Sequence, residues 1–421
     1  MNNIVRREIA DGVHFSAVRD NRFKTMRISA TAMLPLSRET VSAYALLSQV
    51  MTRSCAEYPD FTALSRKLSS LYGASLEAGV RKMGEVLALT FSVSGIDDRY
   101  ALSGDSISRE LSELLCKIIF EPYLEGNAFC GAEVEQERRQ LLELVDSELS
   151  DKRSYATSRL IELMCDKETF GVRRYGTKET INAVSSSELF AAWESMLRTA
   201  RFEIMYIGES DPVFAQQVFA DKFTSVDRLV SKLNTVTTVT PESVREFSDE
   251  MDVSQAKLLL GYRTSVCAPQ QETTAMRLMC AILGGSAHSK FFRNVREKQS
   301  LCYYCVSRYY RVKGIMTVES GVEFENIEKT KNACIAELEA IRRGDITDDE
   351  INFAKLSIAN NFVSICDTVS GIQEWYISQL CDGRMLTPSQ ASEEFNAVTK
   401  EQIVAVANKL SLDTVYMLRG K

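Results

Sequence analysis

Histidine is the scarcest residue in this sequence among those that could carry metal or acid–base chemistry. Only His14 and His288 occur among the 421 residues. The zinc-binding motifs HExxH and HxxEH both require two histidines one helical turn apart. Because positions 14 and 288 cannot lie on one such turn, the sequence excludes both motifs. His288 follows the pair Gly284-Gly285 without a GxSxG pattern, so we interpret it as an ordinary loop residue.

Two other groups of residues have spacings that occur in functional sites. Cys302 and Cys305 form a CxxC pair, which is found in redox and metal sites. Their surroundings alternate as a β-strand, so an odd separation puts the two thiols on opposite faces unless a bulge intervenes. The glutamates between residues 133 and 148 could supply carboxylates to a metal, but alternating charge on a long helix is typical of a solvated face.

The composition limits the classes of protein to consider. Hydrophobic residues make up 45% and charged residues 25%, which is typical of a folded globular chain. The net charge of −7 with scattered Lys and Arg argues against nucleic acid as a partner. No apolar run approaches the ~18 residues of a membrane span, and the N-terminus lacks a signal segment. Eleven mostly isolated cysteines predict reduced thiols and a cytoplasmic location.

The first half of the chain predicts two hairpins separated by helices. Residues 12–36 alternate around a turn at Asp20-Asn21, and residues 74–95 alternate around Lys82-Met83-Gly84. Helical periodicity is expected at 40–52, 60–71, 106–120, 133–165 and 187–198, with Asp60 as a cap and a closing strand at 202–208.

The second half repeats this order of elements. Its expected strands are 257–262, 301–322 and 414–418, with helices at 272–283 and 289–298. The segment INAVS at 181–185 matches FNAVT at 395–399. We therefore predict an α/β (α+β) fold with two homologous duplicated domains, each a mainly antiparallel sheet packed with helices. The predicted domains are 1–224 and 249–421, joined by a Thr-rich linker at 225–248.

The segment FFRNVREKQSLCY at 291–303 resembles the C-terminal domain signature of the insulinase (M16, pitrilysin-like) metallopeptidase family. In that family an Arg and a Tyr of this segment help to hold the substrate peptide, and they match Arg296 and Tyr303. The preceding Gly284-Gly285 also fits, and the duplicated layout covers nearly the whole chain. The resemblance implies an M16 peptidase-like fold.

The same resemblance places the family's zinc helix after the first predicted hairpin, at residues 45–49. Ala45 and Gln49 then stand at the positions of the two zinc-binding histidines, and Ser48 at that of the general-base glutamate. The family's two-glutamate motif resembles residues 137–144, where Leu144 takes the place of the third zinc ligand. The resemblance therefore implies no catalytic residues, no metal ligands and no cofactor in this chain.

This pattern resembles the non-catalytic subunits of paired M16 peptidases, including the bacterial subunit type associated with modification of elongation factor P. It implies a protein that binds peptide and completes the chamber of a heterodimeric zinc peptidase. Zinc is expected only in the partner, an M16 subunit that contains HxxEH. One alternative is a structural or assembly protein that uses the fold as an interaction surface. Another is an active peptidase with an unusual, carboxylate-only metal site.

Overall fold

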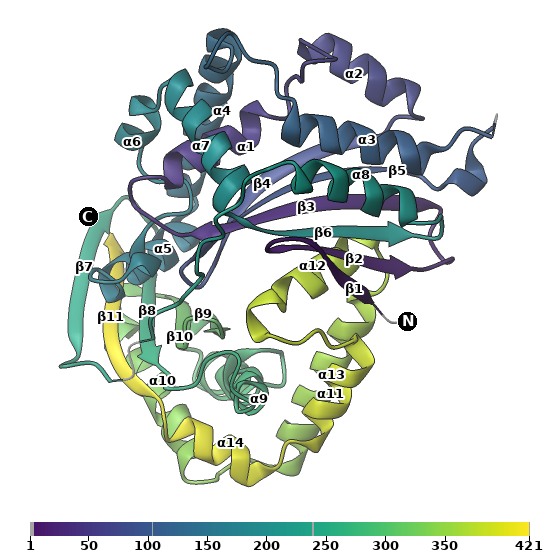
Figure 1. Ribbon diagram of the computed structural model, residues 1–421. Coiled ribbons are helices and arrows are strands. Elements are labelled where there is room, and N and C mark those ends of the chain that lie inside the picture. The colour runs from purple at the N-terminus through teal and green to yellow at the C-terminus, as the bar shows by residue number, and fades with distance from the viewer. Residues whose placement is uncertain (1–3, 103, 238–239, 421) are drawn as a thin grey trace. The chain divides into compact units, whose positions relative to one another are not determined.

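The computed structural model describes residues 4–102, 104–237 and 240–420, which form two compact units (Figure 1). The first unit contains the residues up to 145 together with 172–234 and 366–378. The second contains 146–171, 235–365 and the residues from 379 onward. The chain passes between the units at residues 234 and 235, inside the stretch predicted as a linker. Each unit also takes one segment from the other predicted domain.

A six-stranded sheet of order β1-β2-β6-β3-β5-β4 forms the centre of the first unit. Its central strands β6, β3 and β5 are buried along most of their length. β2 runs parallel to β6, whereas the other neighbouring pairs are antiparallel. The strands are β1 (Val5–Ala10), β2 (Val13–Arg19), β3 (Thr25–Pro35), β4 (Ser75–Met83), β5 (Val86–Ile96) and β6 (Arg201–Gly208).

The hairpin predicted for residues 12–36 is wrong, although both of its strands exist. β6 lies between β2 and β3 and pairs with each of them. A local alternation around a turn cannot reveal that a strand from far along the chain will insert between its two arms. The second predicted hairpin is confirmed, since β4 and β5 pair from Ser75 to Met83.

The helices of the first unit cover both faces of its sheet (Figure 1). The single helix predicted at 133–165 is divided at Asp151, whose side chain accepts a hydrogen bond from the Arg153 backbone and caps a new helix. The first of the two helices, α4, ends at Ser150, and the second, α5, begins at Lys152. The other helices are α1 (Val41–Val50), α2 (Phe61–Ser70), α3 (Ile107–Phe120), α4 (Gly131–Ser150), α6 (Lys178–Ala183), α7 (Ser186–Thr199) and α8 (Val213–Thr224), with the 3₁₀ turn η1 (Asp98–Tyr100).

The second unit contains a five-stranded sheet of order β7-β11-β8-β10-β9. Without β1, the first sheet has the same order and the same directions, including one parallel pair at the corresponding place, β2/β6 and β7/β11. The predicted duplication is thereby confirmed. The strands are β7 (Arg245–Met251), which the sequence reading missed, β8 (Ala256–Arg263), β9 (Cys302–Tyr310), β10 (Ile315–Val322) and β11 (Ser411–Gly420).

The helices of the second unit follow the same order as those of the first. The matched segments around residues 185 and 399 have the same local structure, since Ser185 and Thr399 each begin a helix with a capping box. The helices are α9 (Thr273–Gly284), the π-helix η3 (Phe291–Lys298), α10 (Ile327–Arg342), α11 (Asp348–Ile365), α13 (Pro388–Ala397) and α14 (Lys400–Ala407), with the 3₁₀ turns η4 (Phe324–Asn326) and η5 (Leu380–Asp382).

Two equivalent helices are exchanged between the halves of the sequence. α5 (Lys152–Met164) follows α4 in the chain but packs on β8 and β11 of the second sheet. Its counterpart α12 (Val369–Ser378) packs on β3 and β6 of the first sheet (Figure 1). One face of each sheet is therefore covered by a helix from the other half of the sequence.

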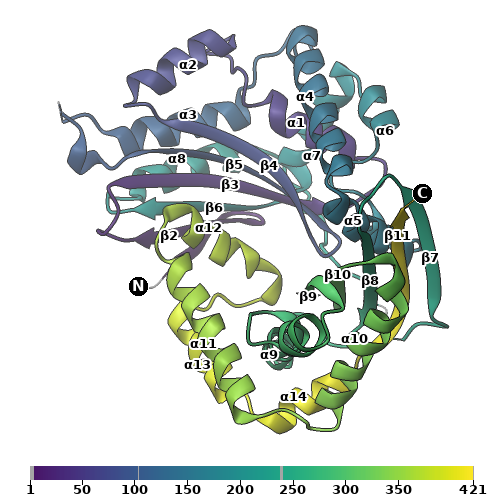
Figure 2. The same cartoon turned by 180° about the vertical axis from the view of Figure 1, so that it is seen from behind.

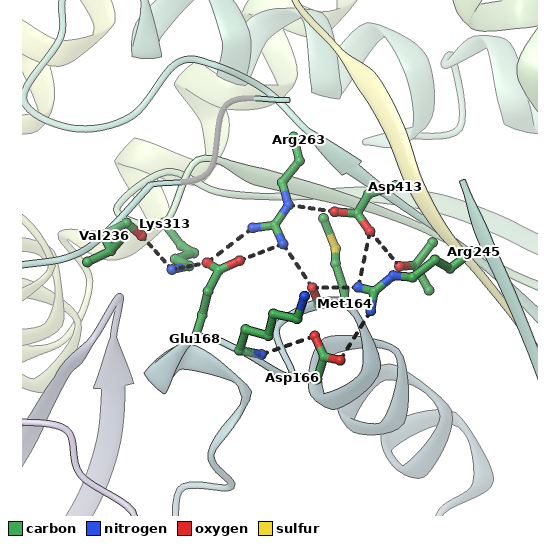
Figure 3. A network of polar contacts seen from close by, with 10 residues as sticks. Met164, Asp166, Glu168, Val236, Arg245, Arg263, Lys313 and Asp413 are labelled. Atoms are coloured by element: carbon green, nitrogen blue, oxygen red, sulfur yellow. Dashed lines mark hydrogen bonds and ion pairs between the residues drawn. The ribbon is translucent and has the colours of Figure 1, made fainter. Parts of the chain in front are cut away.

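The α5 segment, residues 146–171, belongs to the second unit, and a buried network of ion pairs attaches its C-terminal end there (Figure 3). Glu168, in the turn before η2 (Thr169–Gly171), pairs with Arg263 at 2.7 Å and with Lys313. The Arg263 guanidinium also donates to Asp413 at 2.7 Å and to the Met164 carbonyl at 2.8 Å. Because these buried charges are mutually paired, removing one partner should destabilise this attachment.

Candidate functional site

The positions that match the zinc motif lie in the first unit and are filled by non-ligands. Ala45 and Ser48 are fully buried on α1, and the Ser48 hydroxyl donates to the Ala45 carbonyl at 2.8 Å. Gln49 is half-buried and donates to Ser48 Oγ at 3.4 Å. Leu144 on α4 is 41% exposed. Ala45 and Leu144 offer only hydrocarbon, so two of the three ligand positions cannot bind a metal.

An arginine in the turn that follows α1 makes polar contacts with α4. Arg53 lies 3.5 Å from the Glu137 carboxylate and donates to Gln136 at 3.1 Å. Ser54 donates to Glu133 at 2.7 Å, and burial raises the pKa of both Glu133 and Glu137 above the usual value. The solvated-face interpretation is therefore wrong for these two glutamates. Across residues 4–102, 104–237 and 240–420, no group of three or more His, Cys, Asp or Glu is arranged to hold a metal.

The two histidines lie in separate packing environments. His14 is on β2, where burial is the main cause that lowers its pKa. His288 stacks on the ring of Phe353 with centroids 4.4 Å apart, which agrees with its interpretation as an ordinary loop residue.

The predicted substrate residues Arg296 and Tyr303 are brought together in the second unit. Arg296 is on the π-helix η3, and Ser300 then turns the chain into β9 with a left-handed φ of 52°. The turn is closed by a hydrogen bond from Leu301 N to the Val295 carbonyl at 3.1 Å. As a result the Arg296 guanidinium lies 6.0 Å from the centroid of the Tyr303 ring, at the limit of a cation–π contact.

Both side chains are accessible from solvent. Tyr303 is 73% exposed, and the Arg296 side chain is 38% exposed and packs over the Phe292 ring at 4.6 Å. The ion pair between Arg296 and Glu297 is 3.6 Å long and exposed, so it contributes little to stability. β9 is an edge strand of its sheet and lies beside α9 (Figure 2). Within residues 4–102, 104–237 and 240–420 the outer edge of β9 has no strand partner, so Arg296 and Tyr303 lie beside an open strand edge.

A β-bulge explains why Tyr303 projects outward. Cys302 pairs with Val322 and Tyr304 pairs with Gly321, so Tyr303 is an extra residue with no partner on β10. A Cβ at Gly321 would come within 2.5 Å of the Tyr304 ring, so a larger residue opposite this bulge would have to displace that ring. Because of this bulge, Cys302 and Cys305 lie opposite Val322 and Ser320, which share a face of β10, so the opposite-face expectation for a regular strand does not apply here.

The sequence reading missed a polar cavity of about 240 Å³ in the first unit. Arg27 lies in its wall and donates to Gln373 at 2.5 Å and to Ser92 at 2.6 Å. Arg81 pairs with Glu374, while its Nε and Nη2 atoms are buried without a hydrogen-bond partner among the described residues. Gln373 and Glu374 come from α12, which lies in the second half of the sequence but packs in the first unit. Each helix was predicted in the domain of its own half of the sequence, so these residues could not be predicted to line a cavity in the first unit.

Comparisons with known proteins agree with this architecture. Residues 183–358 match the model of the "Peptidase M16 inactive domain". The chain is 30% identical over 409 residues to "Probable inactive metalloprotease YmfF" of Bacillus subtilis, covering 97% of this chain and 96% of that protein. The chain belongs to the peptidase M16 family. It also matches "Uncharacterized zinc protease YmxG" of Bacillus subtilis at 25% identity, over 38% of this chain and 39% of that protein.

Solved structures of similar proteins have the same fold. A conserved protein from Enterococcus faecalis V583 superposes with a TM-score of 0.90 at 27% identity, covering 100% of this chain and 99% of that one. The M16 inactive domain from Pseudomonas fluorescens superposes with a TM-score of 0.79 at 14% identity, covering 100% and 99%. The M16 peptidase-like fold predicted from the sequence is confirmed. The association with elongation factor P modification stays a prediction.

A helix that crosses a bilayer needs about 20 predominantly apolar residues. Within the part of the chain that the structure describes, no helix is both long and apolar enough to cross a bilayer.

Proposed function

We propose that this chain is a non-catalytic M16 subunit that binds peptide through Arg296 and Tyr303 and completes the chamber of a heterodimeric zinc peptidase. The proposal rests on one contrast. The pair matching the family's substrate residues is present, exposed and adjacent. The positions matching the zinc groups hold Ala45, Ser48, Gln49 and Leu144, which provide neither the ligand set nor the base. Zinc and the hydrolytic water would then come from an HxxEH-containing partner.

The chemistry of the two side chains suits a peptide. The Arg296 guanidinium carries several N–H donors that can pair with a peptide carboxylate or carbonyl. The Tyr303 hydroxyl can donate to a backbone carbonyl from its place in the bulge. Neither side chain has a buried structural role, so their exposure favours ligand contact. The eleven cysteines are all free thiols, which supports our proposal of a reducing, cytoplasmic location.

The test uses this chain mixed with an HxxEH-containing M16 chain from the same organism, and the substrate is an unstructured peptide pool. Both Arg296→Ala and Tyr303→Phe should keep the melting temperature of the complex. Arg296→Ala should weaken peptide binding about ten- to a hundred-fold, since a hydrogen bond to a charged group contributes about 1.5–3 kcal/mol. Tyr303→Phe removes a neutral hydrogen bond of about 0.5–1.5 kcal/mol and should weaken binding about two- to ten-fold. Arg293→Ala is the matched control, because Arg293 is exposed on the same π-helix. Normal peptide affinity in both variants would refute the proposed substrate role.

A second candidate, a structural or assembly protein, is favoured by the surface of α11. Phe353, Leu356 and Val363 on this helix are 39%, 57% and 67% exposed, and exposed apolar groups of this size favour protein contacts. Under this alternative, Leu356→Asp would abolish complex formation while Arg296→Ala would change neither complex formation nor peptide binding. The two sets of variants therefore separate the candidates.

A further inference from the structure

The polar cavity of the first unit lies on the face of the sheet that α12 covers (Figure 2). Side chains two residues apart in a strand share a face, so Glu77, Gly79 and Arg81 of β4 lie on one face, and all three line the cavity. Gly79 pairs with Thr90 of β5, which lines it as well. The sheet and α12 therefore enclose this space together.

A glycine leaves room inside the cavity. A Cβ added at Gly79 would meet no described atom within 4 Å, so no side chain of the described residues fills the space above it. The cavity volume of about 240 Å³ is below the roughly 300–1,000 Å³ of pockets that hold drug-sized ligands. The space therefore suits a ligand of only a few heavy atoms.

The positive groups of the cavity are more deeply buried than the negative ones. The side chains of Arg27 and Arg81 are 12% and 27% exposed. Their ion-pair partners, Glu77 and Glu374, are 60% and 65% exposed. A ligand inside the cavity would therefore meet arginine donors first, while two carboxylates on the solvent side would repel a second negative charge on it.

Arg81 has a pair of donors that no described residue uses. Its Nη1 pairs with Glu374, while its Nε and Nη2 are buried without a hydrogen-bond partner among the described residues. The same two atoms of Arg22 bind the two carboxylate oxygens of Asp20, at 2.9 and 2.6 Å. Since a planar carboxylate matches this edge of a guanidinium with two parallel hydrogen bonds, a carboxylate is the group that the free edge of Arg81 fits best.

We propose that this cavity binds a small monocarboxylate whose two oxygens accept from Nε and Nη2 of Arg81. The rest of the ligand lies over Gly79, beside the hydroxyl groups of Thr90 and Ser92. The C-terminus of a peptide offers the same carboxylate, but the small volume favours a free acid. The cavity shares no residue with the Arg296–Tyr303 pair, so this inference does not depend on the proposed function.

Binding would also strengthen the attachment of α12 to the first sheet. Arg27 donates to Gln373 at 2.5 Å, and Arg81 pairs with Glu374, so both arginines already connect the sheet to this helix. A ligand between them adds contacts that exist only while α12 is in place. Amide hydrogen exchange of residues 369–378 should therefore slow when the ligand is bound.

The test titrates the full-length chain with butyrate by calorimetry and follows hydrogen exchange of α12. Butyrate should bind and protect α12. Butyramide has nearly the same shape without the charge, so it should bind at least about ten-fold more weakly. Succinate and inorganic phosphate should bind no more tightly than butyrate, because each carries additional negative charge.

Two variants locate the site, and a third is the control. Arg81→Lys keeps the charge but loses the two-donor edge, so it should weaken butyrate binding at least about ten-fold. Gly79→Val should block binding by filling the space, and valine suits a strand. Arg66→Lys should leave binding unchanged, because Arg66 is exposed on α2 and does not line the cavity.

Thermal melting first establishes that each variant is folded, and Gly79→Val decides if Arg81→Lys is not. Absence of butyrate binding at millimolar concentrations would overturn the site, as would unchanged affinity in a folded Arg81→Lys or Gly79→Val protein. An acetylated tripeptide with a free C-terminus is titrated in parallel. If it binds more tightly than butyrate, the assignment to a free acid is wrong.

Discussion

At the scale of single residues, position 45, which the family resemblance matches to a zinc-binding histidine, tests whether α1 can hold a metal ligand. The Ala45 methyl group is fully buried in a packed core, and an imidazole has several more heavy atoms. We predict that Ala45→His lowers the free energy of unfolding by about 1–3 kcal/mol through overpacking and binds no zinc. Gln49→His is the control, because Gln49 is half-buried and can accommodate a ring. Denaturant unfolding measures both. An Ala45→His protein of unchanged stability would show that the site has kept its cavity.

The unmodified chain should neither hold stoichiometric zinc nor hydrolyse peptides on its own. The described residues contain no metal-holding cluster, and a catalytic zinc needs three protein ligands and an open position. Metal analysis after dialysis against a weak chelator, together with a peptide cleavage assay, measures the two properties. One zinc per chain with metal-dependent cleavage would favour the unusual carboxylate-only site instead.

The continuous motif predicted the exposed pair but not the bulge in β9. Arg296 and Tyr303 are separated by one turn and a short strand segment, so matching a continuous motif was sufficient to find them. The bulge at Tyr303 follows from the pairing of β9 with β10, where Cys302 and Tyr304 lie opposite Val322 and Gly321. The alternation of a single strand contains no information about its register with a partner, so the bulge could not be predicted from the sequence of β9.

At the scale of elements, Glu168 determines how firmly the α5 segment is attached to the second sheet. Burial disfavours its charge, but hydrogen bonds from Arg263 and Lys313 outweigh burial and lower the pKa of Glu168. A lowered carboxyl pKa adds stability above the unfolded value of about 4.3, and this is lost as the pH falls through the folded pKa. We predict that Glu168→Gln lowers the free energy of unfolding by about 3 kcal/mol at pH 7. The free energy of unfolding of this variant should then decrease less than that of the wild type between about pH 5 and 3.

Unfolding in denaturant across that pH range tests this prediction. Glu179→Gln is a suitable control, because Glu179 is a carboxylate in the first turn of α6 and lies outside the network. A pH dependence that is identical in wild type and Glu168→Gln would mean that the network does not govern acid stability.

The paired capping boxes give a second prediction at this scale. Thr399 Oγ accepts from Gln402 N at 3.4 Å, and Gln402 Oε1 accepts from Thr399 N at 2.9 Å. Ser185 and Glu188 make the same reciprocal contacts in the first half. Thr399→Ala and Ser185→Ala should each cost about 1 kcal/mol of stability. Thermal unfolding would detect this, and a neutral result for both would mean that these helix starts are held by packing alone.

The sequence predicted most elements because their signals are local. Asp60 was expected to cap a helix and does accept from Ala63 N, and the β4–β5 hairpin has a tight turn. The errors concern partners that are distant in sequence. β6 separates β2 from β3, and α5 and α12 each pack in the unit dominated by the other half of the chain. Periodicity shows which face of an element is apolar but not which surface will cover it.

At the scale of the whole molecule, the proposed assignment differs between the two motifs of the family resemblance. Under this assignment, Ala45, Ser48 and Gln49 stand at the positions of the catalytic groups in the first motif, while Arg296 and Tyr303 match the substrate residues of the second. Random decay would not be expected to remove one motif and spare the other. A chain with binding residues and no metal has a use in peptide hydrolysis only when another subunit supplies the activated water.

We therefore predict a stable 1:1 complex with an M16 chain that contains HxxEH, and peptidase activity that neither chain has alone. Size-exclusion chromatography with light scattering gives the mass of the complex. A homodimer of this chain and a heterodimer have similar masses, so the presence of both chains in the peak identifies the heterodimer. The control mixes this chain with the partner carrying a substituted HxxEH glutamate, which should still assemble but remain inactive. If no HxxEH-containing M16 chain of the native host binds, the whole-molecule argument fails and the exposed face of α11 becomes the better guide to what this protein contacts.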